Sequence, residues 1–131
     1  MKERRKGNVN KAGVMRVYGL SQSSGVERRL LVENGGQGTL VLIITDHVGN
    51  KERSRILVKV DDLLAAVTDP PAGGCTVEGT APPHGAKMLL DVEVRRNEIL
   101  FRAHSDSDEG ADVAVGLDDF QDALEGLVSR G

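Results

Sequence analysis

Aromatic side chains are almost missing from this chain of 131 residues. They make up 2% of it, namely Tyr18, Phe101 and Phe120, and tryptophan does not occur. A chain of this length can bury a core without disulfides or metals. With so few aromatic rings, that core has to be aliphatic.

Cysteine and long apolar runs are also scarce. Cys75 is the single cysteine, which excludes an intramolecular disulfide and a zinc site built from several cysteines. No apolar run reaches the roughly 18 residues of a membrane span. The basic start at Met1–Lys6 is not followed by the apolar segment of a signal peptide. We therefore expect a cytoplasmic protein without contact to a membrane.

Residue groupings typical of catalysis or metal binding are missing as well. His47, His84 and His104 lie in or next to predicted loops or the linker, and none has a partner at ligand spacing. The acidic stretch Asp106–Asp112 departs from the calcium-binding EF-hand pattern and reads as a hairpin loop. We expect a protein that is not an enzyme and that carries no metal or cofactor.

Charge is distributed unevenly along the chain. Residues 1–60 hold 12 Lys and Arg against 5 Asp and Glu, a balance of +7, whereas residues 61–131 hold 5 against 15, a balance of −10. This asymmetry indicates one face for anions and another for a basic partner. The alternative is that folding mixes the two sets and that both are simply solvated.

A repeat organises the chain. Ile56–Val67 and Val113–Leu124 share one pattern at a constant shift of 57 positions, with aspartate pairs at 61–62 and 118–119. Each copy reads as a strand that leads into a helix, with the first aspartate as its N-cap. Alternating apolar residues before each copy predict further strands.

The repeat predicts the fold class. We expect an α+β fold of two ββββα repeats, in which each antiparallel sheet packs against its C-terminal helix and a pseudo-twofold axis relates the two. A single domain at 13–131 would hold repeat I at 13–69, a linker at 70–75 and repeat II at 76–131. Residues 1–12 are expected to form a disordered basic arm.

Two stretches carry a family resemblance. Glu33–Leu40 is similar to the hairpin between the first two strands of a PUR repeat, and Arg53–Ile56 is similar to the strand before its helix. The chain thus resembles the PUR and Whirly group of single-stranded nucleic-acid-binding proteins, which implies weakly sequence-specific binding of DNA or RNA. It departs from the family at Gly35, Gly36 and Gln37, where basic residues are usual, and in its few aromatics. Each stacked base that is lost weakens binding by about 1–3 kcal/mol.

A basic strand face is the candidate binding site. Alternation places Arg53, Arg55 and Lys59 on one side of a strand, and cations about 7 Å apart can follow a phosphate backbone. Neighbouring strands add further candidates. The full set is Arg16, Tyr18, Arg28, Arg29, Arg53, Arg55 and Lys59. The alternative is that these cations protect a sheet edge from aggregation.

A second hypothesis concerns a different class of function. The chain would be a protein interaction or scaffold module of the same fold that does not bind nucleic acid. It would dimerise through aliphatic surfaces and meet a basic partner through its acidic half. On either hypothesis we expect a homodimer or a higher homo-oligomer, because exposed sheet edges find partners.

Overall fold

The structure, a computed structural model, describes residues 8–9, 14–82 and 85–130. The expected basic arm at 1–12 lies outside the described residues, apart from Asn8–Val9. In chain order the elements are β1 (Asn8–Val9), β2 (Val14–Leu20), β3 (Glu27–Gly36), β4 (Thr39–Asp46), β5 (Glu52–Lys59), α1 (Val60–Thr68), β6 (Cys75–Ala81), β7 (Ala86–Arg95), β8 (Glu98–Ser105), β9 (Asp108–Gly116) and α2 (Leu117–Arg130).

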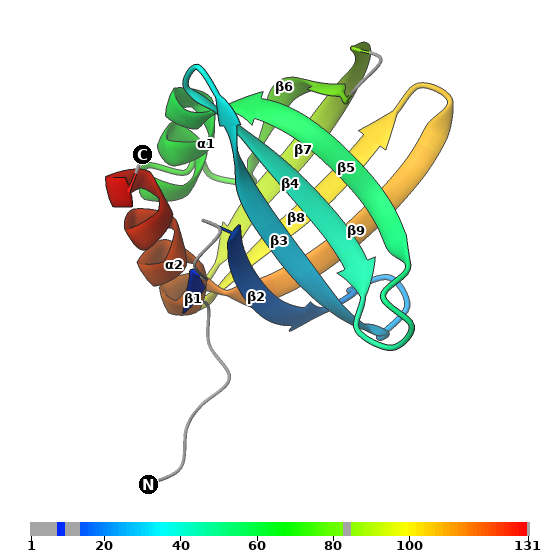
Figure 1. The fold of residues 1–131 in the computed structure, drawn as a ribbon. Coiled ribbons are helices and arrows are strands. Elements are labelled where there is room, and N and C mark those ends of the chain that lie inside the picture. Colours follow the sequence, from blue (N-terminus) through cyan, green and yellow to red (C-terminus); the bar gives the residue numbers. More distant parts are fainter. Residues whose placement is uncertain (1–7, 10–13, 83–84, 131) are drawn as a thin grey trace, which may run out of the picture.

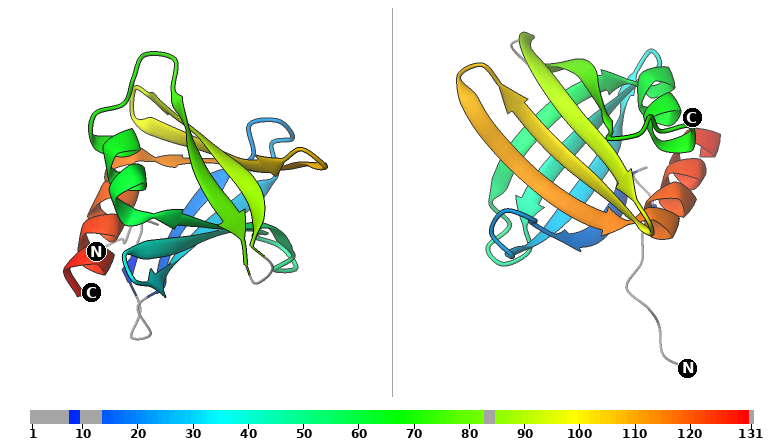
Figure 2. Two further views of the ribbon diagram at one scale, coloured as in Figure 1. Left: turned by 90° about the horizontal axis from the view of Figure 1, so that it is seen from above. Right: turned by 180° about the vertical axis from the view of Figure 1, so that it is seen from behind.

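Strands β2–β9 form one antiparallel sheet that closes into an eight-stranded barrel (Figure 1, Figure 2). Each strand pairs with the next, and β2 then pairs with β9, where Gly19 lies opposite Val115. β5 and β6 meet at one registered pair, Leu57 opposite Thr80. The barrel therefore consists of two four-stranded sheets, β2–β5 and β6–β9, joined at two short seams.

The helices α1 and α2 lie side by side at one end of the barrel (Figure 1, Figure 2). Their buried residues belong to the same hydrophobic cluster as the inward-facing strand residues. Phe120 of α2 packs against Phe101 of β8, with 5.1 Å between the ring centroids. Within the described part of the chain, neither helix has the length and apolar character needed to cross a bilayer.

The expected fold class is wrong, because the strands form one closed barrel and not two sheets that each pack on a helix. The order of elements does run ββββα twice from β2 onward. The barrel closes because the apolar face of the first sheet is larger than its helix can cover. α1 buries only Leu63, Ala66 and Val67. The first sheet alone contributes these buried inward residues: Met15, Val17, Leu30, Val32, Leu40, Leu42, Ile44, Ile56 and Val58. One short helix cannot cover that face, so the two sheets cover each other, and joining them pairs their edges.

The two halves are equivalent where their helices begin. The N–H of Val60 donates to the carbonyl of Gly38 at 2.9 Å, and the N–H of Leu117 donates to the carbonyl of Asn97 at 2.7 Å. The two donors are 57 positions apart, as in the sequence repeat. In each half, a hairpin turn thus holds the start of the helix that follows two strands later.

The expected aspartate caps are wrong. α1 begins at Val60 with Lys59 as its N-cap, and no side chain bonds to the free N–H groups there. Asp61 and Asp118 lie inside the first turns. There a negative charge interacts favourably with the positive end of the helix dipole.

A glycine lies at each seam because the two backbones approach closely there. A Cβ on Gly19 would overlap the carbonyl oxygen of Ala114, and a Cβ on Gly79 would overlap the carbonyl oxygen of Leu57. Leu57 and Ala114 are again 57 positions apart. Both seams therefore close only where one strand carries no side chain.

Alanine at either glycine is expected to force the seam apart. Gly19→Ala and Gly79→Ala are each expected to lower the free energy of unfolding by about 1–3 kcal/mol, the usual cost of overpacking. Urea unfolding followed by circular dichroism measures this. Gly116→Ala is the control, because its Cβ would lie 3.2 Å from the mobile end of the Asp119 side chain. Equal stability of all three variants would contradict the role of the seam glycines.

Candidate functional site

Strand alternation divides the predicted site between the inside and the outside of the barrel. Arg28 shares the inward face of β3 with Leu30, and its side chain is only 12% exposed. Arg16 and Tyr18 of β2 and Arg29 of β3 lie on the opposite, outer face, where all three are partly exposed. The predicted residues therefore do not form one continuous row.

Two of the predicted cations are paired with Asp46, the last residue of β4. Arg53 donates to its Oδ2 from Nη2 at 2.7 Å and from Nε at 3.0 Å, and Arg28 donates to its Oδ1 at 3.2 Å. The bonds from Arg53, followed by those from Arg28, hold the pKa of Asp46 below its ordinary value. Arg28 also donates to the carbonyl of Asp112 in β9 at 2.9 Å. Both arginines thus act within the fold.

A third predicted cation is paired within its own strand. Arg55 donates to the two carboxylate oxygens of Glu52 at 3.1 and 2.8 Å. This pair lowers the pKa of Glu52 and raises that of Arg55. Lys59, by contrast, is exposed at the end of β5, and its side chain makes no hydrogen bond or ion pair among the described residues.

Five residues gather on the outer face of β2–β4. Tyr18, Arg29 and Thr45 lie directly opposite one another on the three strands, and Arg16 precedes Tyr18 by two positions on the same face. His47 follows β4, and its ring meets the ring of Tyr18 edge-on, with 5.8 Å between centroids and 77° between planes. We call these five residues the outer cluster.

Unpaired polar atoms are concentrated in the outer cluster. Among the described residues, the buried side-chain nitrogen and oxygen atoms without a hydrogen-bond partner are Arg16 Nε, Arg29 Nε, Thr45 Oγ1 and His47 Nδ1. Such atoms are uncommon in folded proteins, because leaving one unpaired costs about 1–3 kcal/mol. Their gathering at one place makes the outer cluster the candidate site.

The two arginines of the outer cluster carry uncompensated charge. Arg29 donates from Nη2 to the carbonyl of Asp46 at 3.4 Å, whereas the Asp46 carboxylate is occupied by the other two arginines. Within the described part of the chain, neither Arg16 nor Arg29 has a carboxylate within ion-pair distance. The outer cluster therefore presents two permanent positive charges.

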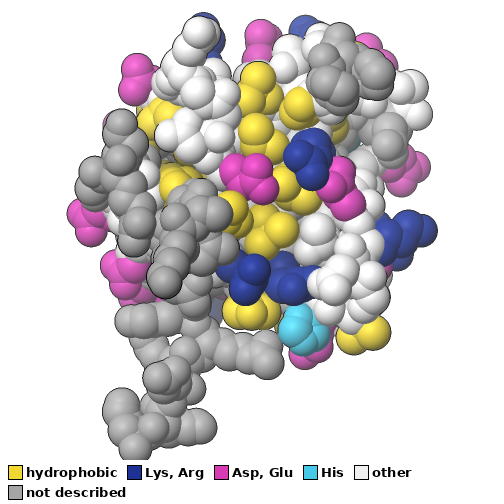
Figure 3. Space-filling view, viewed as in Figure 1, with side chains coloured by type: hydrophobic (Ala, Val, Ile, Leu, Met, Phe, Trp, Pro, Cys, Tyr) yellow, Lys and Arg dark blue, Asp and Glu magenta, His cyan; other side chains and the backbone are white. Residues whose placement is uncertain are grey.

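Apolar side chains continue the outer face beyond the outer cluster. Leu31 and Ile43 lie opposite each other on β3 and β4, and Val41 and Leu57 lie opposite each other on β4 and β5. Ile43 is 2% exposed although it points away from the interior, since neighbouring side chains cover it. Figure 3 shows hydrophobic side chains on this face beside Lys and Arg and one histidine.

Thr45 and His47 were not among the predicted site residues. Thr45 is the penultimate residue of β4 and His47 opens the hairpin loop after it, and neither position differs locally from many others. Their place follows from the register that sets Thr45 opposite Arg29 and from the ring contact with Tyr18. Alternation within a strand does not reveal which residues of neighbouring strands lie opposite each other.

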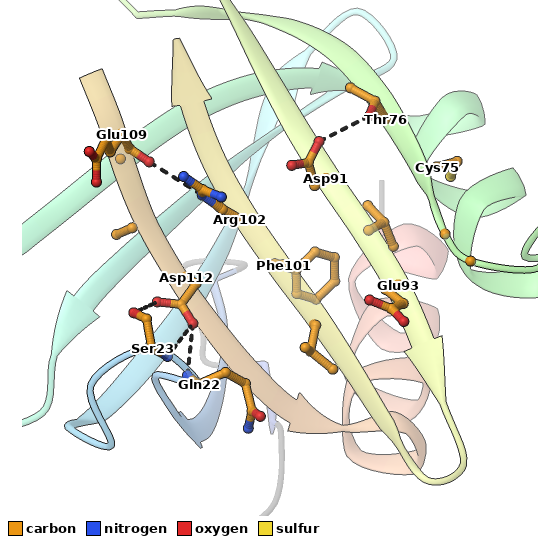
Figure 4. A pocket seen from close by; sticks show the side chains of 16 residues that line it. Gln22, Ser23, Cys75, Thr76, Asp91, Glu93, Phe101, Arg102, Glu109 and Asp112 are labelled. Carbon is orange, nitrogen blue, oxygen red and sulfur yellow. Dashed lines mark hydrogen bonds between the residues drawn. The ribbon is translucent and has the colours of Figure 1, made fainter. Parts of the chain in front are cut away.

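A second concave surface lies on the outer face of β7–β9 (Figure 4). It has a volume of about 720 Å³ and several carboxylates. Three of these bond within the chain: Asp112 with Ser21, Gln22 and Ser23, Asp91 with Thr76, and Glu93 with Arg95. In the part of the chain that the structure describes, no group of three His, Cys, Asp or Glu could hold a metal. None of the unpaired atoms of the outer cluster belongs to this hollow.

Comparisons with family models, curated proteins and solved structures found no match. The resemblance to the PUR repeat therefore stays a prediction from the sequence.

Acid is expected to weaken the fold through Asp46 and Asp112. Burial alone would raise the pKa of Asp112, but hydrogen bonds from Ser23, Ser21 and the backbone of Gln22 outweigh burial and lower it. Because both folded-state pKa values lie below the ordinary 3.8, each carboxylate stabilises the fold above that pH, and the contribution is lost as the pH falls further.

The measurement is the urea midpoint between about pH 5 and pH 2, the range in which such a contribution disappears. Wild type is expected to lose more stability over this range than Asp46→Asn, which is already weaker at neutral pH. Asp106→Asn changes an exposed carboxylate between β8 and β9 and is the control. A wild-type pH dependence in Asp46→Asn would contradict this assignment.

Proposed function

We propose that this protein is a non-enzymatic single-stranded nucleic-acid-binding protein that holds DNA or RNA on the outer face of β2–β5, with weak sequence specificity. The observation that supports this most is the set of unpaired donors on Arg16 and Arg29 beside the rings of Tyr18 and His47. Guanidinium groups suit phosphate oxygens, and rings suit bases, so the two needs of a single strand are met together.

The number of available cations limits the electrostatic part of this binding. Among the predicted cations, Arg53, Arg55 and Arg28 are engaged with carboxylates, which leaves Arg16, Arg29 and Lys59 of that set to meet phosphates. Each phosphate contact on a single strand adds about 0.7 to the slope of log affinity against log salt concentration. Three contacts correspond to a slope of about −2, a moderate salt dependence.

The number of aromatic rings on this face limits how much base stacking can contribute to the binding affinity. Tyr18 and His47 meet edge to face, so they form one small platform on this side of the barrel. A stacked base contributes about 1–3 kcal/mol by substitution, whichever base it is. One platform therefore supports modest affinity and little sequence preference.

A second candidate function is protein interaction, above all self-association, by the same face. The supporting observation is the pair Val41 and Leu57, which is partly exposed and lies next to Leu31 on the outer sheet surface. Contiguous apolar side chains on a sheet face commonly mark an interface. This candidate requires neither the arginines nor the rings.

Titration of labelled single-stranded DNA and RNA at about 50 and 200 mM salt tests the first proposal, because counterion release is large over that range. The double variant Arg16→Gln, Arg29→Gln is expected to lose most of the binding and to reduce the salt slope by about 1.4, because two phosphate contacts disappear. Arg55→Gln is expected to change affinity less, since Glu52 already engages that side chain.

Arg95→Gln serves as the matched control, because Arg95 is exposed at the end of β7 in the other half. Absence of binding at about 50 mM salt would rule the proposal out. Binding that survives the double variant unchanged would place the site elsewhere on the molecule.

Sedimentation velocity tests the second candidate. If the apolar outer face joins two copies, Val41→Glu with Leu57→Glu is expected to weaken dimerisation at least about tenfold, equivalent to 1.4 kcal/mol. Leu100→Glu places the same charge on the outer face of β8 and is the control. A monomer at all concentrations in wild type, or equal dimerisation in both variants, would contradict this candidate.

A further inference from the structure

The positive charge of the outer cluster favours a phosphomonoester over a phosphodiester. Arg16 and Arg29 together carry two positive charges that no carboxylate of the described residues offsets by ion pairing. An internal phosphodiester carries one negative charge, whereas a phosphomonoester carries about 1.5 to 2 at neutral pH and has three strong acceptor oxygens. Two guanidinium groups thus match a monoester better than a diester.

The strand register brings the donors within reach of one such group. Thr45 lies directly opposite Arg29 at the spacing of adjacent strands. Arg16 is the diagonal neighbour of Arg29, and diagonal neighbours are about 7–8 Å apart, which long side chains span. The Nε–H groups of both arginines and the hydroxyl of Thr45, which is 6% exposed, are the unpaired groups.

Among the residues that the structure describes, this face has no second pair of arginines without carboxylate partners. On β5, Arg53 donates two hydrogen bonds to the carboxylate of Asp46, and Arg55 donates two to the carboxylate of Glu52. Lys59 stands alone at the far end of that strand. A bound strand therefore meets one place with two available guanidinium groups, and that place adjoins the rings of Tyr18 and His47.

We propose that the outer cluster binds a phosphomonoester that is attached to a nucleoside, with Arg16, Arg29 and Thr45 on the phosphate and Tyr18 beside the base. This rests on the proposed function for the source of the group, which is then the phosphorylated end of a single strand. The protein recognises strand ends more tightly than strand interiors. A free mononucleotide carries the same chemistry and is the other source.

Competition binding with one ten-residue single strand tests this proposal. The strand is prepared with a 5′-phosphate, with a 3′-phosphate, or with hydroxyls at both ends, and a nucleoside 5′-monophosphate and inorganic phosphate are the small competitors. At least one phosphorylated end is expected to bind at least about tenfold more tightly than the unphosphorylated strand, because charge-assisted hydrogen bonds are added. The mononucleotide is expected to compete more weakly than the phosphorylated strand.

Variants show whether the outer cluster causes the difference. Arg16→Gln with Arg29→Gln is expected to abolish the preference for a phosphorylated end, and Thr45→Val to reduce it, since the hydroxyl alone is removed. Arg95→Gln is expected to keep it. Circular dichroism verifies that each variant folds, and inorganic phosphate is expected to shift the imidazole NMR signals of His47 in wild type and in Arg95→Gln but not in the double variant.

The outcomes separate this proposal from the proposed function. Equal binding of phosphorylated and unphosphorylated strands would overturn the phosphomonoester site and leave single-strand binding intact. A mononucleotide that binds as tightly as the phosphorylated strand would keep the site and overturn single-strand binding as its purpose. A preference that persists in the double variant would overturn the assignment to the outer cluster.

Discussion

Close backbone contact at the two seams is the constraint on which the rest of this structure depends. Gly19 and Gly79 let the edge strands approach until they pair, and the closed interior then holds the apolar faces of both sheets. Because side chains fill that interior, any ligand has to be met on the outside of the barrel. Few residue pairs join the strands at each seam, so hydrogen bonds from side chains provide further contacts across it. Arg28 reaches from β3 to the backbone of Asp112 in β9.

Some of the arginines that were predicted to bind a ligand instead form ion pairs that stabilise the fold. Alternation gives the face on which a cation lies, but it does not give the carboxylate that the cation meets. Asp46 ends β4 at the point where Arg28 and Arg53 converge, so both guanidinium groups form ion pairs with its carboxylate. The two arginines without a carboxylate partner, Arg16 and Arg29, have apolar or hydroxylated neighbours across the sheet, Leu31 and Thr45.

Local periodicity explains what could be predicted. Leu63 and Phe120, 57 positions apart, are both fully buried, and the order of strands and helices follows the repeat, because each depends on spacing within a short stretch. Barrel closure could not be predicted in this way, since it depends on contacts between distant segments, such as Gly19 with Val115. The outer cluster depends on which residues of neighbouring strands lie opposite each other and on the ring contact between Tyr18 and His47, neither of which is visible in the period-two pattern.

The barrel's pseudo-symmetry explains why, among the described residues, the buried unpaired donors lie on one outer face and not on the other. Arg55 and Asp112 occupy equivalent outward positions of the repeat. Asp112 bonds to the loop after β2 and fastens one seam, whereas Arg55 pairs with Glu52 in its own strand. The inward faces of both halves have to remain apolar because they share one core. The outward faces do not touch each other, so a change on one leaves closure intact. A repeat that constrains only its inner surface can therefore use one outer face for structure and leave the other free for the proposed single-strand binding.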